Sequence, residues 1–340
     1  MPENITFRTQ LLGGVTEFCQ ATALPIFSNS LHLVELIVKL ARYQEEGVKL
    51  SPKVYLTNDI KKIGNLLPGG EILKIGIANS DSEGIKVAIK KCAPLATEGW
   101  LLYINNENNK IEYGLFRGSE SPISVLVDDV LLGDDDDLRI VKVHQVADEC
   151  VEIRSNKGEY HYIFLDHRKE DAKPPLYFID NLVNAITEDV EPELKEPTVS
   201  FLKKILFNSL RESHGCLIAV TGMKKTPKFL EEDGIVLEEP INFPSLISNL
   251  KKNTIHTSHI ESKASLLKGM LNSDGILLFD NKAKLLGYNF FVKPKKNDTV
   301  IGGARKRAFA FLSSKINHGL NSVFMQSQDG WSDFVGGSND

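Results

Sequence analysis

Short apolar runs separated by turn residues are the feature that most narrows what this chain folds into. From Val54 onward such runs alternate with clusters of Gly, Pro, Asn and Asp, a pattern typical of β-strands joined by turns. Apolar residues at helical spacing from Ile26 to Tyr43 predict an amphipathic helix before them. The combination predicts a mixed α/β fold. The predicted strands are Val54–Leu56, Leu73–Ala78, Ile85–Ile89, Trp100–Ile104, Ile111–Phe116, Ile140–Val146, Cys150–Arg154 and Tyr160–Leu165.

The length of 340 residues, 42% of them hydrophobic and 25% charged, allows more than one hydrophobic core. Helical patterns over Leu176–Ile186 and Phe201–Leu210 flank the stretch Glu188–Pro197, whose Glu and Pro content predicts a linker. We therefore expect an N-terminal α/β domain over residues 1–195 and a second α/β domain over residues 196–340. The boundary is expected between residues 188 and 200.

The charge balance excludes some classes of partner. A formal net charge of −5 and a pI near 6.0 argue against a protein that coats nucleic acid, because that requires a broadly basic surface. No run approaches the ~18 apolar residues needed to span a bilayer, and the start of the chain does not resemble a secretory leader. The four scattered cysteines form no zinc or redox motif. We expect a cytoplasmic protein without nucleic-acid or membrane partners.

An acidic residue and a glycine precede an apolar run in the segment Ser273–Phe279. A carboxylate at the end of a strand holds a divalent metal or positions a hydroxyl, and the glycine lets a ligand approach the backbone. Asp-Gly is also an ordinary turn. Asp274 and Gly275 therefore form a candidate site only in combination with other features.

A glycine pair followed by three cations opens a predicted helix over Gly302–Leu312. Cations are unfavourable at the positive end of a helix unless an anion joins them. Free backbone amides and arginine side chains at that end suit a phosphate group. The helix should begin near Ala304, and its first turn is a candidate phosphate site or a general basic patch.

The segment Val323–Gly330 is an apolar strand that ends in polar residues. Ser327, Gln328 and Asp329 would place hydrogen-bonding groups and one carboxylate at its end. Alone, this pattern is also that of a strand followed by a turn.

The order of these three pieces resembles the catalytic domain of the diadenylate cyclase family. The hallmarks of that family are an Asp-Gly-Ala motif, an Arg-His-Arg motif that opens a helix, and a strand that ends in a Ser-Glu-Glu-like element. Upstream, Gly215–Val220 looks like its first core strand and Glu232–Leu237 like the following segment. The resemblance runs from about residue 200 to residue 340, and the preceding part is more loosely similar to the sensor regions of some bacterial cyclases.

The resemblance implies a central twisted mixed sheet flanked by helices, preceded by an α/β sensor domain. It implies that two ATP molecules, bound by two facing copies of the chain, are joined into a cyclic dinucleotide such as cyclic di-AMP. Pyrophosphate would leave, with Mg²⁺ or Mn²⁺ as cofactor and a homo-oligomer as the active form. Carried over by position, the catalytic residues would be Asp274, Arg305 and Arg307, the nucleotide-binding residues Gly275, Ile276, Gly303, Ala304, Lys306, Ser327 and Gln328, and the metal ligands Asp274 and Asp329.

Four positions depart from the family pattern: Ser273, Ile276, Lys306 and Gln328. Lys306 replaces the central His and keeps the positive charge, but does not carry protons in the same way. Gln328 replaces a carboxylate and is a weaker metal ligand. An active cyclase and a catalytically degenerate module that binds nucleotide or cyclic dinucleotide both fit these changes. The third hypothesis is an interaction protein whose basic turn binds an acidic partner.

Overall fold

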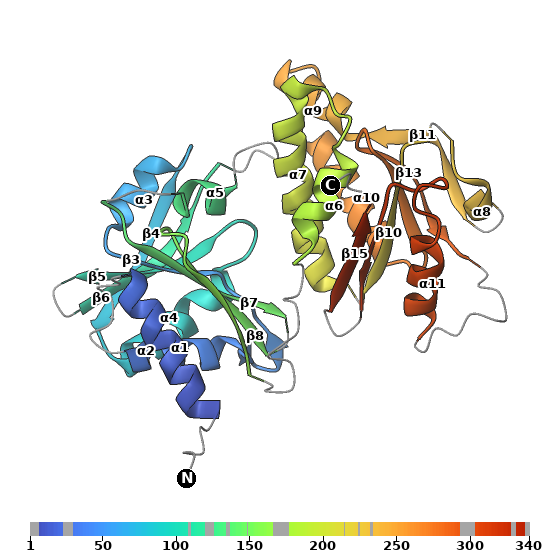
Figure 1. The fold of residues 1–340 in the computed structure, drawn as a ribbon. Coiled ribbons are helices and arrows are strands. Elements are labelled where there is room, and N and C mark those ends of the chain that lie inside the picture. Colours follow the sequence, from blue (N-terminus) through green and yellow to red (C-terminus); the bar gives the residue numbers. More distant parts are fainter. Residues whose placement is uncertain are drawn as a thin grey trace, which may run out of the picture. The chain divides into compact units, whose positions relative to one another are not determined.

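The computed structural model divides the chain into two compact units, each described here by itself (Figure 1). The first comprises Met1–Glu120 and Val125–Ala172, and the second Ser121–Ser124 and Lys173–Asp340. The structure describes residues 7–22, 30–107, 110–119, 126–133, 137–147, 149–165, 177–213, 215–223, 225–231, 234–292, 303–327 and 331–336. An α/β class is thereby confirmed, with one mixed sheet in each unit.

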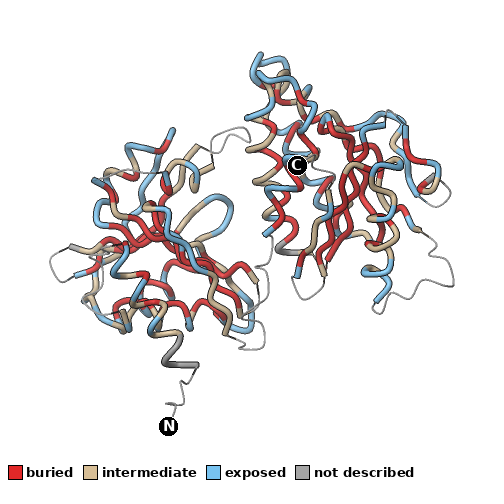
Figure 2. The backbone as a smooth tube through the Cα atoms, in the orientation of Figure 1, coloured by how far each residue is buried: buried red, intermediate tan, exposed pale blue. Residues whose placement is uncertain are grey.

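The first unit is built on a seven-stranded sheet with the order β4-β6-β5-β3-β7-β8-β9. β3 runs parallel to β5, and the other neighbouring pairs are antiparallel. Its central strands are buried on both faces, which explains their continuous apolar runs (Figure 2). The strands are β3 (Val54–Thr57), β4 (Glu71–Asn79), β5 (Leu101–Glu107), β6 (Lys110–Arg117), β7 (Ile140–Ala147), β8 (Cys150–Ser155) and β9 (Tyr160–Phe164), beside a small hairpin of β1 (Gln44–Glu45) and β2 (Val48–Lys49).

Helices cover both faces of this sheet. One face packs against α1 (Phe7–Thr22), α2 (Ser30–Leu40) and α4 (Ser82–Cys92). The other packs against α3 (Ile60–Leu66) and α5 (Val127–Leu131). A short 3₁₀ turn, η1 (Ala93–Leu95), follows α4.

The strand predicted over residues 85–89 is wrong, because this segment lies inside α4. The Asp81 carboxylate accepts a hydrogen bond from the Gly84 amide and caps the helix. Buried positions recur at Ile85, Ala88, Ile89 and Cys92, the spacing of one helix face. The cap upstream of the apolar run therefore decides the conformation.

A buried ion cluster joins α5 to the sheet of the first unit. Lys142 on β7 donates to Asp128 at 2.7 Å and lies 2.7 Å from Glu152 on β8, while Tyr55 on β3 also donates to Asp128. Burial alone would raise the pKa of Asp128, but the nearby Lys142 ammonium outweighs it, and the pKa falls well below its ordinary value. Asp128 is therefore held as a carboxylate in the folded chain.

This depressed pKa predicts how acid affects the first unit. The stabilisation is present above the unfolded pKa of about 4 and is lost as the pH falls below it, because the unfolded state then binds the proton more readily. Urea unfolding measured from pH 7 to pH 2 should show that the free energy of unfolding falls by about 2 kcal/mol, which is the usual contribution of hydrogen bonds to a charged group. Asp128→Asn should flatten that part of the profile. Asp137→Asn is the control, because the carboxylate of Asp137 is exposed and its removal should leave the dependence of unfolding free energy on pH unchanged. If this dependence were unchanged in Asp128→Asn and flattened in Asp137→Asn, the account would be contradicted.

The second unit has a six-stranded sheet with the order β11-β13-β12-β10-β14-β15. Its central strand, β10, pairs parallel with β12 and antiparallel with β14. The polar ends of three strands therefore meet at one edge of the sheet. The strands are β10 (Cys216–Thr221), β11 (Ile235–Asn242), β12 (Ile276–Asp280), β13 (Lys284–Phe290), β14 (Ser322–Gln326) and β15 (Ser332–Gly336).

Two helical layers sandwich this sheet (Figure 1). One face packs against α6 (Ile179–Ile186), α7 (Pro192–Glu212), α9 (Phe243–Lys251) and α10 (Thr257–Leu271). The opposite face packs against α8 (Lys228–Glu231) and α11 (Ala304–Ser313). The expected sheet flanked by helices is thus present, and the helix with the basic first turn begins at Ala304 as predicted.

The boundary between the units lies near residue 173, upstream of the expected range 188–200. α6 belongs to the second unit because its apolar face, including Leu182 and Ile186, packs in that unit's core. The segment predicted as a linker contains the start of α7. Pro192 stands in the first helical turn, where a missing N–H group costs little.

No helix in the described part of the chain is both long enough and apolar enough to cross a membrane.

Candidate functional site

The site lies at the edge of the second sheet where β10 and β12 begin and β14 ends. The register pairs Leu217 with Ile276 and Cys216 with Gln326. Past the ends of β10 and β14, a Cβ atom on Gly215 would lie 2.8 Å from the backbone of Ser327, so these two residues are neighbours. Asp274 stands in the bend two residues before β12, the strand that pairs with β10 on its other side, and neighbouring strands lie about 4.8 Å apart.

A fourth strand extends this end of the sheet. The Ser327 amide donates to the Trp331 carbonyl at 2.7 Å, which sets Trp331 opposite Ser327 at the start of β15. We call the set Asp274, Gly215, Ser327 and Trp331 the strand-end row. Side chains alternate between the faces of a sheet, and Leu217, Ile276 and Met325 all pack on the α11 side. Gly215, Ser327 and Trp331 therefore face the same side as α11.

The first turn of α11 stands over this row. Gly303 is the N-cap and provides no side chain to cap the helix amides, so the positive end of the helix is available to an anion. A Cβ atom built on Gly215 would lie 2.6 Å from Nη1 of Arg305. The guanidinium group therefore rests on the bare backbone of Gly215, between the strand ends that carry Asp274 and Ser327.

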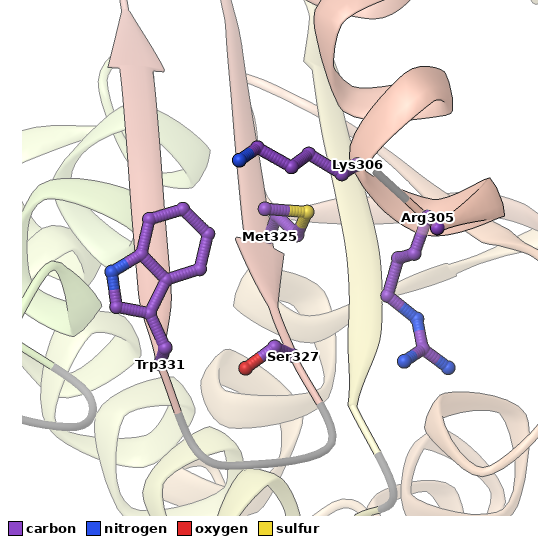
Figure 3. A pocket seen from close by; sticks show the side chains of 6 residues that line it. Arg305, Lys306, Met325, Ser327 and Trp331 are labelled. Carbon is purple, nitrogen blue, oxygen red and sulfur yellow. The ribbon is translucent and has the colours of Figure 1, made fainter. Parts of the chain in front are cut away.

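A pocket of about 420 Å³ opens beside this guanidinium group. Figure 3 shows Lys306 extending across Met325 towards the indole of Trp331, while Arg305 descends on the other side of β10, towards the start of that strand. The volume of the pocket falls in the range of small-molecule sites, about 300–1,000 Å³. The lining residues are Gly303, Arg305, Lys306, Met325, Ser327 and Trp331.

Four of the residues predicted from the sequence line this pocket, namely Gly303, Arg305, Lys306 and Ser327. Ala304 is the exposed first residue of α11. Asp274 is exposed within the strand-end row, outside the pocket lining. Gln328 and Asp329 lie outside the described residues.

The other predicted residues do not line the pocket. Ile276 is buried in the core beneath α11, and a Cβ atom on Gly275 would lie 2.3 Å from the backbone of Asn289. Both residues support the sheet edge from inside. Arg307 is exposed, and two residues of helix turn it by about 200° from Arg305. It therefore lies on another side of α11.

The sequence analysis did not predict three of the residues that form the site: Gly215, Met325 and Trp331. Gly215 was read only as the start of a strand, and its positive φ of 92° is a property of the folded backbone. Trp331 directly follows a glycine after the polar end of β14. An aromatic residue at that point of a hairpin was the one available signal.

The Cys216 thiol lies next to the site and feels the charge of Arg305. Burial raises the pKa of the neighbouring Cys216 thiol to about 12, although the positive charge of Arg305 acts in the opposite direction. The thiol is therefore protonated at neutral pH and does not compete as a nucleophile.

The described residues contain no group of three or more His, Cys, Asp or Glu side chains that could hold a metal ion. Asp274 alone still fits Mg²⁺ or Mn²⁺ held jointly with a nucleotide, since Mg²⁺ usually binds one or two carboxylates together with substrate phosphates. Its exposure just before the start of β12 leaves the carboxylate open to such a ligand.

Comparison with known proteins gives no match, either to a protein-family model or to a curated protein.

Proposed function

We propose that the second unit binds ATP at this pocket and joins two ATP molecules into a cyclic dinucleotide, cyclic di-AMP or a related product. The observation that carries the proposal is the Arg305 guanidinium group, which is seated on Gly215 beside Ser327, at the end of the sheet where the segment of Asp274 leads into β12. A cation, a carboxylate and a hydroxyl thereby share one strand edge at the start of a helix.

The triphosphate would be held by charge. Arg305 grips phosphate oxygens in a bidentate manner, Lys306 adds a second cation in the pocket lining, and the amides at the start of α11 favour an anion. The Ser327 hydroxyl is buried and makes no hydrogen bond within the described residues, so a phosphate oxygen that reached it would satisfy this group.

The reaction consists of two equivalent substitutions. The 3′-oxygen of one ATP forms a bond to the α-phosphorus of the other, the bond from that phosphorus to the bridging oxygen breaks, and pyrophosphate leaves with the electron pair. Asp274 accepts the hydroxyl proton or orients the hydroxyl. Arg305 offsets the charge that grows on the phosphoryl oxygens, and Mg²⁺ or Mn²⁺, when bound, would supply further charge stabilisation.

Ring closure requires two bound nucleotides with opposed reactive ends. Each copy of the chain presents one Asp274 and one Arg305, so the active form would be a homo-oligomer in which two copies of the pocket face each other. The first unit would then act as a sensor that controls how the two pockets meet, as its looser resemblance to cyclase sensor regions implies.

The direct functional test is to incubate the purified chain with ATP and Mn²⁺ or Mg²⁺ and to identify products by mass spectrometry. Cyclic di-AMP and pyrophosphate in a ratio of about one to two support the enzyme. Lys306 in the pocket lining favours one alternative, a receptor that grips the nucleotide without turnover, because a lysine does not relay protons as a histidine does. Tight ATP binding without product would support that receptor.

Arg305→Ala should reduce the stabilisation that ATP gives to the fold. A ligand at 100 times its Kd stabilises the native state by about 2.7 kcal/mol, and loss of a charge-assisted contact of about 2 kcal/mol weakens the Kd about 30-fold. Thermal unfolding with and without ATP and Mn²⁺ measures the difference. Lys282→Ala, an exposed cation in the turn between β12 and β13 at the opposite end of β12, is the matched control. An equal response of both variants would remove Arg305 from the site.

A further inference from the structure

Among the described residues that line the pocket, Trp331 alone has an aromatic ring. Its backbone is fixed opposite Ser327 by the hydrogen bond from the Ser327 amide to the Trp331 carbonyl. The residue nevertheless remains 39% exposed, whereas Met325 on the neighbouring strand β14 is 2% exposed. The sheet edge thus presents a flat apolar surface that is held in place but is not covered by the described part of the chain.

The position of this indole bears on the class of ligand. Figure 3 shows the ring on the far side of Met325 from Arg305, with the Lys306 side chain extending towards it. A phosphate group alone would contact the cations and make no contact with the indole ring. A ligand that combines an anion with a flat aromatic group uses both sides of the pocket.

We propose that Trp331 is the platform on which the base of the bound nucleotide stacks, with the phosphates turned towards Arg305 and α11. This proposal depends on the proposed function and makes Trp331 a residue that determines specificity. Stacking a base on an aromatic side chain is favourable for every base because each has a π-face. The Lys306 side chain, which extends towards the ring in Figure 3, adds attraction for the phosphates.

The two tryptophans of the chain make the proposal measurable in the native fold. Trp100 lies in the first unit, where the Arg117 guanidinium group stands 4.6 Å from the centre of the indole ring. In Trp100→Phe, Trp331 is the one remaining tryptophan of the chain, so all indole fluorescence comes from it. ATP should quench this emission on saturation, and inorganic tripolyphosphate should bind with little quenching. Equal quenching by the two ligands, or none by bound ATP, would overturn the proposal.

Calorimetric titration of Trp331 variants provides the second measurement. Trp331→Leu should weaken ATP binding tenfold or more and leave tripolyphosphate binding unchanged, because only the base loses its partner. Trp331→Phe, which keeps an aromatic face, should recover most of the affinity. ATP binding that is unchanged in Trp331→Leu refutes the platform alone and leaves the nucleotide site standing. Failure of the wild-type chain to bind either ligand would instead refute the proposed function.

Discussion

Asp274→Asn is expected to lower the rate of cyclic dinucleotide formation by about 10²- to 10⁴-fold, the usual contribution of a proton-transfer group. The amide has nearly the same shape as the carboxylate but neither accepts the hydroxyl proton nor offers a full charge to a metal. Because Asp274 is exposed at the start of β12, the free energy of unfolding should change by less than about 0.5 kcal/mol. Product formation by mass spectrometry and urea unfolding measure the two effects.

The matched control is Asp180→Asn, on α6 and on the opposite face of the same sheet. Asp180 forms an ion pair with Lys203 at 2.8 Å and is 62% exposed, and a surface pair of this kind contributes little to stability. Its product formation should match that of the unaltered chain. Full turnover by Asp274→Asn would exclude the carboxylate from the chemistry.

Gly215→Ala is expected to destabilise the fold by about 3 kcal/mol and to impair triphosphate binding. The φ of 92° is costly for any residue with a Cβ atom. That atom would also lie 2.6 Å from both Nη1 of Arg305 and the Gln326 carbonyl oxygen. Overpacking of this kind lowers the free energy of unfolding by about 1–3 kcal/mol more. Among the groups that would clash with the added Cβ atom, the Arg305 side chain moves most easily. We therefore expect the guanidinium group to leave its position on Gly215.

Gly269→Ala separates this effect from a general response to alanine. Gly269 lies in α10, and a Cβ atom there would meet nothing within 4 Å, so the change should stabilise the helix by about 0.5–1 kcal/mol. Calorimetry with tripolyphosphate then tests the link to Arg305 through a double-mutant cycle. In an Arg305→Ala background, Gly215→Ala should have no further effect on affinity. Additive losses of affinity would show that Gly215 acts by another route.

The sequence predicted most of the elements that carry the site, because their signals are local. The apolar run after Gly215 is β10, the run after Asp274 is β12, and the glycine and cations before Phe309 open α11. The misread segments have signals that depend on context. Ile85–Ile89 alternates like a strand until the cap at Asp81 is taken into account, and the proline at residue 192 suits a linker and a first helical turn equally well.

The site itself was only partly predictable, because its assembly depends on register. Sequence order led to the prediction that Asp274, Arg305 and Ser327 belong to one site, but it did not indicate that the Arg305 guanidinium group rests on Gly215 beside Ser327. Arg305 and Arg307 are equivalent cations in the sequence, and the direction of each on α11 distinguishes them. Trp331 joins the pocket only through the antiparallel pairing of β14 with β15.

The most direct test of the account is a crystal structure of the chain with a non-hydrolysable ATP analogue and Mn²⁺, with the metal located by anomalous scattering. The account predicts phosphate oxygens at hydrogen-bond distance from the Arg305 guanidinium and the first amides of α11, with the Mn²⁺ peak in contact with the Asp274 carboxylate. A nucleotide bound with its phosphates away from Arg305, or a metal peak remote from Asp274, would contradict it.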